Sequence, residues 1–233
     1  MAEMPLQLEV NERNRDPRAA CVLVVDVSGS MAGEPIRELS RGYEQFVEEL
    51  NNDPLARKRA EVAVVTFGSG ASLTVPFQEA RNLTPQEFIA SGTTNMAAGI
   101  NMALDIIEER KQGYRAAGLE YFRPWMFLLT DGSPDPSGFD AAVTRVLDAQ
   151  SAKKVTLFAV GVGDNVNFEH LRRLSSERGP LSLKGLDFSS MFAWLSSSMS
   201  RVSMSNTAHA DDDSPSDPNE MIELAPPGWG KIA

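Results

Sequence analysis

The hydrophobic and polar positions of this chain follow two patterns, one typical of strands and one of helices. Residues 21–25 form an unbroken apolar run that ends at Asp26, and a second such run, 125–129, is followed by Thr130 and Asp131. A continuous apolar run closed by a polar turn is typical of a strand buried on both faces of a sheet. By this criterion, strands are expected at about 20–26, 61–67, 124–131, 155–161 and 181–184.

Between these runs, apolar side chains recur every three or four residues. In residues 34–51, for example, one stripe holds Leu39, Tyr43 and Phe46, while charged side chains occupy the opposite face. This spacing predicts an amphipathic helix with one side against the core. By the same spacing, helices are expected at about 34–51, 95–112, 138–150, 167–176 and 188–203.

Strands that alternate with helices predict an α/β protein with a mostly parallel sheet. Residues 73–77 are the exception, because they alternate apolar and polar side chains, contain Pro76 and closely follow the turn at 68–70. So short a connection allows only an antiparallel hairpin, and proline favours an edge position. We therefore expect a Rossmann-like open sheet of six strands, mostly parallel, with one antiparallel edge strand and helices on both faces.

The chain divides into a lead-in, a domain and a tail. Its 233 residues are enough for one large domain with a sizeable core. Residues 1–18 form a short, largely polar lead-in, and 19–204 carry the alternating strand and helix pattern. Residues 205–233 form an acidic tail that we expect to be disordered.

The tail has two parts of different composition. From residue 205 onward, six acidic residues stand against a single base, Lys231. Residues 211–219 contain proline and no large apolar side chain, which is the composition of a disordered segment. Residues 224–232 regain apolar side chains, including Trp229, and are a candidate docking peptide.

Composition narrows the classes of partner and compartment. A formal net charge of −10 and an isoelectric point near 4.8 argue against nucleic acid as the main partner. The single cysteine, Cys21, lies in a predicted buried strand, so no disulfide framework exists and a reducing compartment fits. No apolar run reaches membrane-spanning length, and the first twenty residues lack the apolar core of a signal peptide. We expect a cytoplasmic protein without a membrane partner.

Oxygen-bearing side chains follow the ends of two central strands. Asp26, Ser28 and Ser30 alternate in a loop between a strand and a helix, Asp131 ends another central strand, and Thr94 precedes a helix. Because the carboxyl ends of parallel strands share one edge of a sheet, these side chains are expected to converge. Hard oxygen ligands of this kind suit a hard cation such as Mg²⁺ or Mn²⁺.

Other interpretations of the same residues remain open. Loops rich in aspartate and serine are common before helices as turns, and a threonine there is often an N-cap. A serine nucleophile is disfavoured, because the glycine–serine–glycine elbow is absent and the chain has only two histidines, His170 and His209. A phosphate-binding loop is disfavoured, because no lysine stands beside a run of glycines. Together, at matching strand ends, the residues favour a cation site.

The same residues resemble the motif of von Willebrand factor A domains. Asp-Xaa-Ser-Xaa-Ser follows the first strand, a threonine opens a later helix, and Thr-Asp-Gly follows the fourth strand. The resemblance covers about residues 18–203, and it departs from the pattern at Ala97, where many members carry glycine. It implies a metal-ion-dependent adhesion site for Mg²⁺ or Mn²⁺ at Asp26, Ser28, Ser30, Thr94 and Asp131.

Further stretches are similar to the tellurium-resistance (TerY-type) subgroup of that family. These stretches lie at 28–36, 90–94, 123–124 and 192–199. Members of the subgroup are stand-alone cytoplasmic bacterial proteins associated with tellurite and chemical-stress resistance, and with protein kinases and phosphatases. The resemblance implies a protein partner from such a system that offers a carboxylate to the metal.

The resemblance implies binding rather than catalysis, so we expect no enzymatic activity. Neutral hydroxyl ligands leave a cation electron-poor, with a coordination position for a partner's carboxylate. No histidine or lysine is expected beside the metal to act as a base. The alternative is a metal-dependent phosphoryl-transfer hydrolase, which would ordinarily carry a second acid where Ser28 stands. A dinucleotide enzyme, suggested by residues 161–165, lacks the third glycine and follows the wrong strand.

Overall fold

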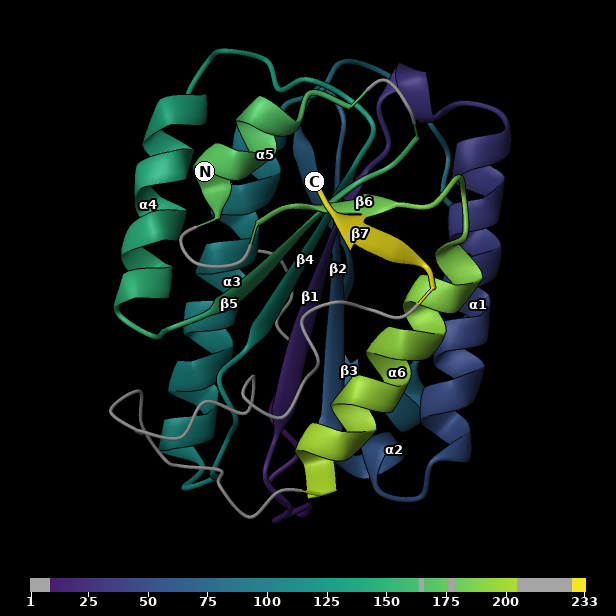
Figure 1. The fold of residues 1–233 in the computed structure, drawn as a ribbon. Helices are drawn as coiled ribbons and strands as arrows, with labels where there is room; N and C mark the ends of the chain where they lie inside the picture. Colours follow the sequence, from purple (N-terminus) through teal and green to yellow (C-terminus); the bar gives the residue numbers. More distant parts are fainter. Residues whose placement is uncertain (1–8, 164–165, 176–178, 205–227) are drawn as a thin grey trace.

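The computed structural model describes residues 9–163, 166–175, 179–204 and 228–233 and shows a seven-stranded sheet between two layers of helices (Figure 1). The strands lie in the order β3-β2-β1-β4-β5-β6-β7. Their bounds are β1 Ala19–Asp26, β2 Ala60–Phe67, β3 Ala71–Glu79, β4 Trp125–Thr130, β5 Thr156–Gly161, β6 Leu181–Leu183 and β7 Gly230–Ile232. The α-helices are α1 Glu34–Asn52, α2 Ala56–Arg59, α3 Met96–Ala116, α4 Phe139–Ser151, α5 Phe168–Leu174 and α6 Phe188–Met204.

Strand β1 lies at the centre of the sheet and divides its side chains between two hydrophobic cores. All eight of its residues are buried, and it pairs in parallel with β2 on one side and β4 on the other. Because successive side chains of a strand point to opposite faces, Leu23 packs in the core beneath α1 and α6. Its neighbours Val22 and Val24 pack in the core beneath α3 and α4. Figure 1 shows α1, α2 and α6 on one face and α3, α4 and α5 on the other.

The α/β fold predicted from the sequence is confirmed, and the expected number of strands is wrong. Five parallel strands and the antiparallel edge strand β3 are present as expected. A seventh strand, β7, adds to the other edge, antiparallel to β6. It consists of three residues without an alternating pattern, so only its pairing with a distant strand makes it a strand. The four-residue helix α2 was not expected either.

The end of the expected tail is part of the folded domain. Residues 228–233, which the sequence assigned to the acidic tail, lie on the edge of the sheet with Trp229 only 1% exposed. Residues 205–227 lie outside the described residues, as does His209, so the prediction of disorder there stays a prediction. The candidate docking peptide, 224–232, is described only from residue 228 onward.

The polar lead-in is tied to the sheet by a buried network of charged side chains. Arg18 is fully buried, and its Nε lies 3.0 Å from Oε1 of Glu61, which is also fully buried. The other carboxylate oxygen of Glu61 accepts from Arg110 at 2.6 Å and from the hydroxyl of Tyr114 at 2.5 Å. The Arg18 guanidinium also donates to the backbone carbonyls of Asn11 and Asn14, so both partners of the ion pair have further hydrogen bonds.

This network joins the lead-in, β2 and α3 at the end of the sheet where β1 and β2 begin. Burial raises the pKa of Tyr114, and the neighbouring Glu61 charge adds to that rise. The Arg110 guanidinium also lies over the ring of Phe77, 5.7 Å from its centroid. A buried charge is tolerated only where it is paired and hydrogen-bonded, and Glu61 meets both conditions.

We predict that Glu61→Gln lowers the free energy of unfolding by about 3 kcal/mol or more, because it removes the buried carboxylate charge that pairs with both Arg18 and Arg110. Urea denaturation measures this loss. The control is Arg41→Ala, which breaks the exposed Arg41–Glu38 pair and should cost less than about 1 kcal/mol. Equal losses for the two variants would show that the buried network does not stabilise the fold.

Candidate functional site

The candidate site lies where β1 and β4 end, and it begins at a fully buried carboxylate. Asp26 is 0% exposed, and both of its oxygens accept hydrogen bonds. The backbone N–H of Ser28 donates to Oδ1 at 2.8 Å, and the hydroxyl of Thr130 donates to Oδ2 at 2.6 Å. Burial raises the pKa of Asp26, and the nearby charge of Asp131 adds to this rise, while hydrogen bonds from the backbone and side chain of Ser28 and from the side chain of Thr130 oppose it. The site thus contains a carboxylate whose charge is only partly compensated.

A chain of hydroxyl and carboxylate groups links the two strand ends. The hydroxyl oxygens of Ser28 and Ser30 lie 3.0 Å apart, and Ser30 donates to Oδ1 of Asp131 at 2.7 Å. Ser28 is 1% exposed, whereas Ser30 and Asp131 reach the surface. The loop after β1 thus meets the loop after β4 through side-chain oxygens.

Thr94 joins this group from a third loop. A Cβ added to Gly132 would lie 3.4 Å from the Thr94 hydroxyl oxygen and 3.8 Å from that of Ser30, so both hydroxyls border the same small space. The structure therefore brings all five residues singled out in the sequence to one edge of the sheet: Asp26, Ser28, Ser30, Thr94 and Asp131.

Backbone hydrogen bonds hold the loop that carries Thr94. The N–H of Ser91 donates to the carbonyl of Val27 at 2.6 Å, and Gly29 donates to Gly92 at 3.0 Å. Gly92 has a φ of +82°, and a Cβ there would lie 2.4 Å from the hydroxyl oxygen of Ser69. Only glycine fits this position without strain, so the loop has a well-defined path past the end of β1.

Two residues that shape the site were not singled out from the sequence. Thr130 belongs to the Thr-Asp-Gly motif, but its hydrogen bond to Asp26 could not be read from a strand pattern. Asp135 accepts a hydrogen bond from the hydroxyl of Thr93 at 2.8 Å, and its N–H donates to the carbonyl of Thr94 at 2.9 Å. The hydroxyls of Thr93 and Thr94 therefore have different surroundings, since that of Thr93 is bound to a carboxylate outside the group of five.

The chemistry of the five side chains fits a hard divalent cation. Two carboxylates and three hydroxyls offer only oxygen, which Mg²⁺ and Mn²⁺ accept readily. In the described part of the chain no group of three or more histidine, cysteine, aspartate or glutamate side chains could hold a metal, so hydroxyl ligands would be essential. His170 lies on α5 with its ring against Phe139, 5.7 Å between centroids.

Gly161, the last residue of β5, has a packing role. A Cβ on Gly161 would lie 2.7 Å from the ring of Phe168 at the start of α5, so glycine is needed for this helix to approach the strand. The next residues of the supposed dinucleotide stretch, 164–165, lie outside the described part of the chain.

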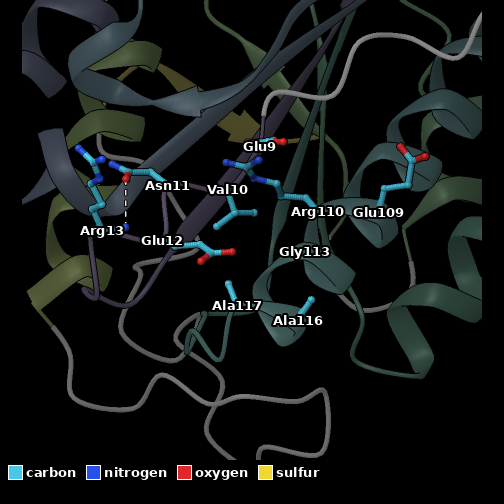
Figure 2. Close-up of a pocket in the computed structure, with 10 residues that line it drawn as sticks. All are labelled: Glu9, Val10, Asn11, Glu12, Arg13, Glu109, Arg110, Gly113, Ala116 and Ala117. Carbon is cyan, nitrogen blue, oxygen red and sulfur yellow. Dashed lines mark hydrogen bonds between the residues drawn. The ribbon is translucent and has the colours of Figure 1, made fainter.

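A cavity of about 920 Å³ lies away from these residues, beside the end of α3 (Figure 2). Figure 2 shows residues 9–13 on one side of it and side chains of α3 on the other. Its charged lining mixes the acids Glu9, Glu12 and Glu109 with the bases Arg13 and Arg110. Neither this cavity nor one of about 350 Å³ between α3 and α4 is lined by any of the five candidate residues. Ser30 and Asp131 of the candidate site reach the surface, whereas Asp26 and Ser28 are buried beneath them.

Comparison with known families gives one clear match. The family model of the von Willebrand factor type A domain matches residues 21–191. An uncharacterized protein of Synechocystis is 28% identical over 209 residues, which is 88% of this chain and 44% of that protein. The chain thus spans less than half the length of this relative. No helix in the described ranges has the length and apolar character needed to cross a membrane.

Solved structures share the fold at low sequence identity. The pilus adhesin SpaC of Lactobacillus rhamnosus GG has a TM-score of 0.61 at 15% identity, and the match covers 84% of this chain and 31% of the adhesin. The manganese-loaded TRAP protein of Plasmodium vivax has a TM-score of 0.52 at 19% identity, covering 70% of this chain and 65% of TRAP. These similarities establish the fold alone.

We predict that Asp26→Asn stabilises the protein in chelating buffer at neutral pH. Since burial raises the pKa of Asp26 in the folded state, ionisation of this carboxyl costs stability as the pH rises above the unfolded value of about 4. Asparagine keeps the shape and removes the charge. The variant should match wild type near pH 4 and melt a few degrees higher at pH 7.

Thermal unfolding from pH 4 to 8 measures the difference. Asp148→Asn, at an exposed position on α4, is the control and should show no such change with pH. If Asp26→Asn is less stable than wild type at pH 7 without metal, the ionised carboxylate is fully compensated by its hydrogen bonds.

Proposed function

We propose a function on the premise that this chain belongs to the von Willebrand factor type A domain family. Domains of this family often mediate protein interactions and often bind divalent metals. We propose that this one is a non-enzymatic module that binds a partner protein through a single Mg²⁺ or Mn²⁺ ion. The observation that carries the proposal is the meeting of two carboxylates and three hydroxyls from three loops at one edge of the sheet.

The hydroxyls of Ser28, Ser30 and Thr94 would hold the ion directly, with Asp26 and Asp131 close to it, as in a metal-ion-dependent adhesion site. When bound, the cation supplies a positive charge with a coordination position open to an outside ligand. The chain's own residues hold the two carboxylates in position. Asp26 is held in place by Thr130 and by the Ser28 backbone, and Asp131 is held by Ser30. The manganese-loaded TRAP protein, which has a similar fold, supports the choice of metal.

The partner would contribute a carboxylate. Three neutral hydroxyl ligands leave the cation with much of its charge, so a carboxylate from another protein binds it better than a neutral group does. Without the cation, the same carboxylate would meet the negative charges of Asp26 and Asp131. The proposed site therefore binds an acidic side chain only when the metal is present.

The proposed biological setting follows from the TerY-type motif stretches. We propose a role in a bacterial tellurite or chemical-stress resistance system, in the cytoplasm, with a kinase or phosphatase of that system as a partner. The alternative of a metal-dependent phosphoryl-transfer hydrolase finds less support in the geometry. Both oxygens of Asp26 are engaged by hydrogen-bond donors, and Ser28 stands where a second acid would be needed.

For metal binding, we predict that Thr94→Val weakens Mn²⁺ affinity by roughly tenfold or more, because it removes one oxygen ligand while keeping the side-chain shape. Isothermal titration calorimetry measures the affinity. Thr93→Val is the matched control, since the Thr93 hydroxyl is bound to Asp135, and it should keep the wild-type affinity within about threefold. Equal losses in the two variants, or none in either, would remove Thr94 from the ligand set.

For partner binding, we predict that proteins captured from the native cell by the immobilised chain are released by chelator and are not captured by Thr94→Val. Thr93→Val should capture the same proteins as wild type. Quantitative mass spectrometry of the three samples measures this. Capture that is equal with metal, with chelator and with Thr94→Val would contradict metal-bridged recognition. Turnover of a phosphoester by the wild-type protein, lost in Asp26→Asn, would favour the hydrolase.

A further inference from the structure

The last described residues of the chain occupy a site built by other parts of the fold. Strand β7 pairs antiparallel with β6, with Gly230 opposite Leu183 and Ile232 opposite Leu181. Two further backbone bonds extend the pairing, from the N–H of Lys184 to the carbonyl of Trp229 at 2.8 Å and from Ala233 to Pro180 at 2.9 Å. Figure 1 shows β7, in yellow, at the open edge of the sheet beside β6.

We propose that the outer edge of β6 and the aromatic surface beside it form a peptide-binding site, and that residues 228–233 are its exchangeable ligand. The ligand class is an extended peptide with a tryptophan between two glycines. In one molecule the chain's own end occupies the site, and the same segment of a second copy fits it equally. This inference does not depend on the metal-binding proposal.

One side chain anchors the peptide. Trp229 is 1% exposed and packs against Trp194 of α6, with 5.5 Å between ring centroids. Trp194 in turn contacts Phe127 and Phe158, both at 5.9 Å, and these rings belong to the core beneath α6. Trp229 is therefore the outermost contact of an aromatic cluster whose other members, Trp194, Phe127 and Phe158, belong to the body of the domain.

Apart from Trp229, the residues of this segment resemble a bound peptide more than a core strand, because their side chains are not buried. Ile232 is 59% exposed, and Gly230 and Lys231 are not buried, so backbone pairing and Trp229 carry the association. Backbone hydrogen bonds to a sheet edge and a pocket for one side chain are the usual means by which sheets bind peptides. The Nε1 of Trp229 is buried and makes no hydrogen bond with the residues that the structure describes, which weakens the anchoring.

The composition of the segment between α6 and the peptide is typical of a linker. Residues 205–227 separate the end of α6 from the peptide, carry six acidic residues and contain neither lysine nor arginine. A linker that can span the distance to a site gives an attached peptide an effective concentration that can reach about the millimolar range. The chain's own end should therefore exclude a free peptide at micromolar concentration, unless its anchor or its tether is removed.

The test is binding of a fluorescent peptide of residues 224–233 to the full-length chain, measured by anisotropy. We expect saturable binding to Trp229→Ala protein, whose own peptide has lost its anchor, and binding at least about tenfold weaker to wild type, whose site is occupied. In the peptide, Trp229→Ala should abolish binding and Ile232→Ala should preserve it, since these residues are buried and exposed respectively.

A second measurement avoids any folding defect of the Trp229→Ala protein. A specific protease site is placed within residues 211–219 of the otherwise wild-type chain, and the chain is cut after folding. We expect the fragment to stay bound at first and then to be displaced by excess labelled peptide. Retention of the fragment without exchange would show that β7 is a permanent part of the core. Equal binding to wild type and Trp229→Ala, or full binding of the Trp229→Ala peptide, would also overturn the proposal.

Discussion

The buried carboxylate of Asp26 is the constraint on which the candidate site depends. It lies at the end of a strand that is covered on both faces, so water cannot solvate its charge. Ser28 and Thr130 donate hydrogen bonds to it, and the negative charge of Asp131 lies nearby. The raised pKa of Asp26 means that this environment favours a proton, or another positive charge, at the site. A cation among the surrounding hydroxyls would meet that need.

At the opposite end of the sheet, a second buried acid has its charge neutralised by other side chains of the protein. Glu61 at the start of β2 is as buried as Asp26, but it is paired with Arg18 and Arg110 and accepts a hydrogen bond from Tyr114. Its charge is matched within the protein. Among the described residues, the hydrogen bonds to the Asp26 carboxylate come from neutral groups of Ser28 and Thr130. The contrast between two buried acids in neighbouring strands is the strongest physical argument that one of them serves a ligand.

Most of this architecture could be predicted from the sequence, because the hydrophobic pattern of each central strand matches its position in the middle of the sheet. Unbroken apolar runs can be strands only if both faces are covered, which fixes β1 and β4 in the middle of the sheet and their polar ends at one edge. The contacts of Thr130 and Asp135 with the site could not be predicted, because they depend on how separate loops meet. Strand β7 was missed for a related reason, since three residues adopt extended structure only by pairing with β6. The charge network around Glu61 likewise joins residues far apart in the chain, so no local sequence pattern predicts it.

The central claim is that one divalent cation occupies the edge of the sheet where Asp26 and Asp131 meet three hydroxyls. A crystal structure of the protein grown with Mn²⁺, with an anomalous difference map at the manganese absorption edge, tests it most directly. The account predicts a single strong peak bounded by the hydroxyl oxygens of Ser28, Ser30 and Thr94. A map without a peak there, or with manganese bound only elsewhere on the molecule, would contradict it.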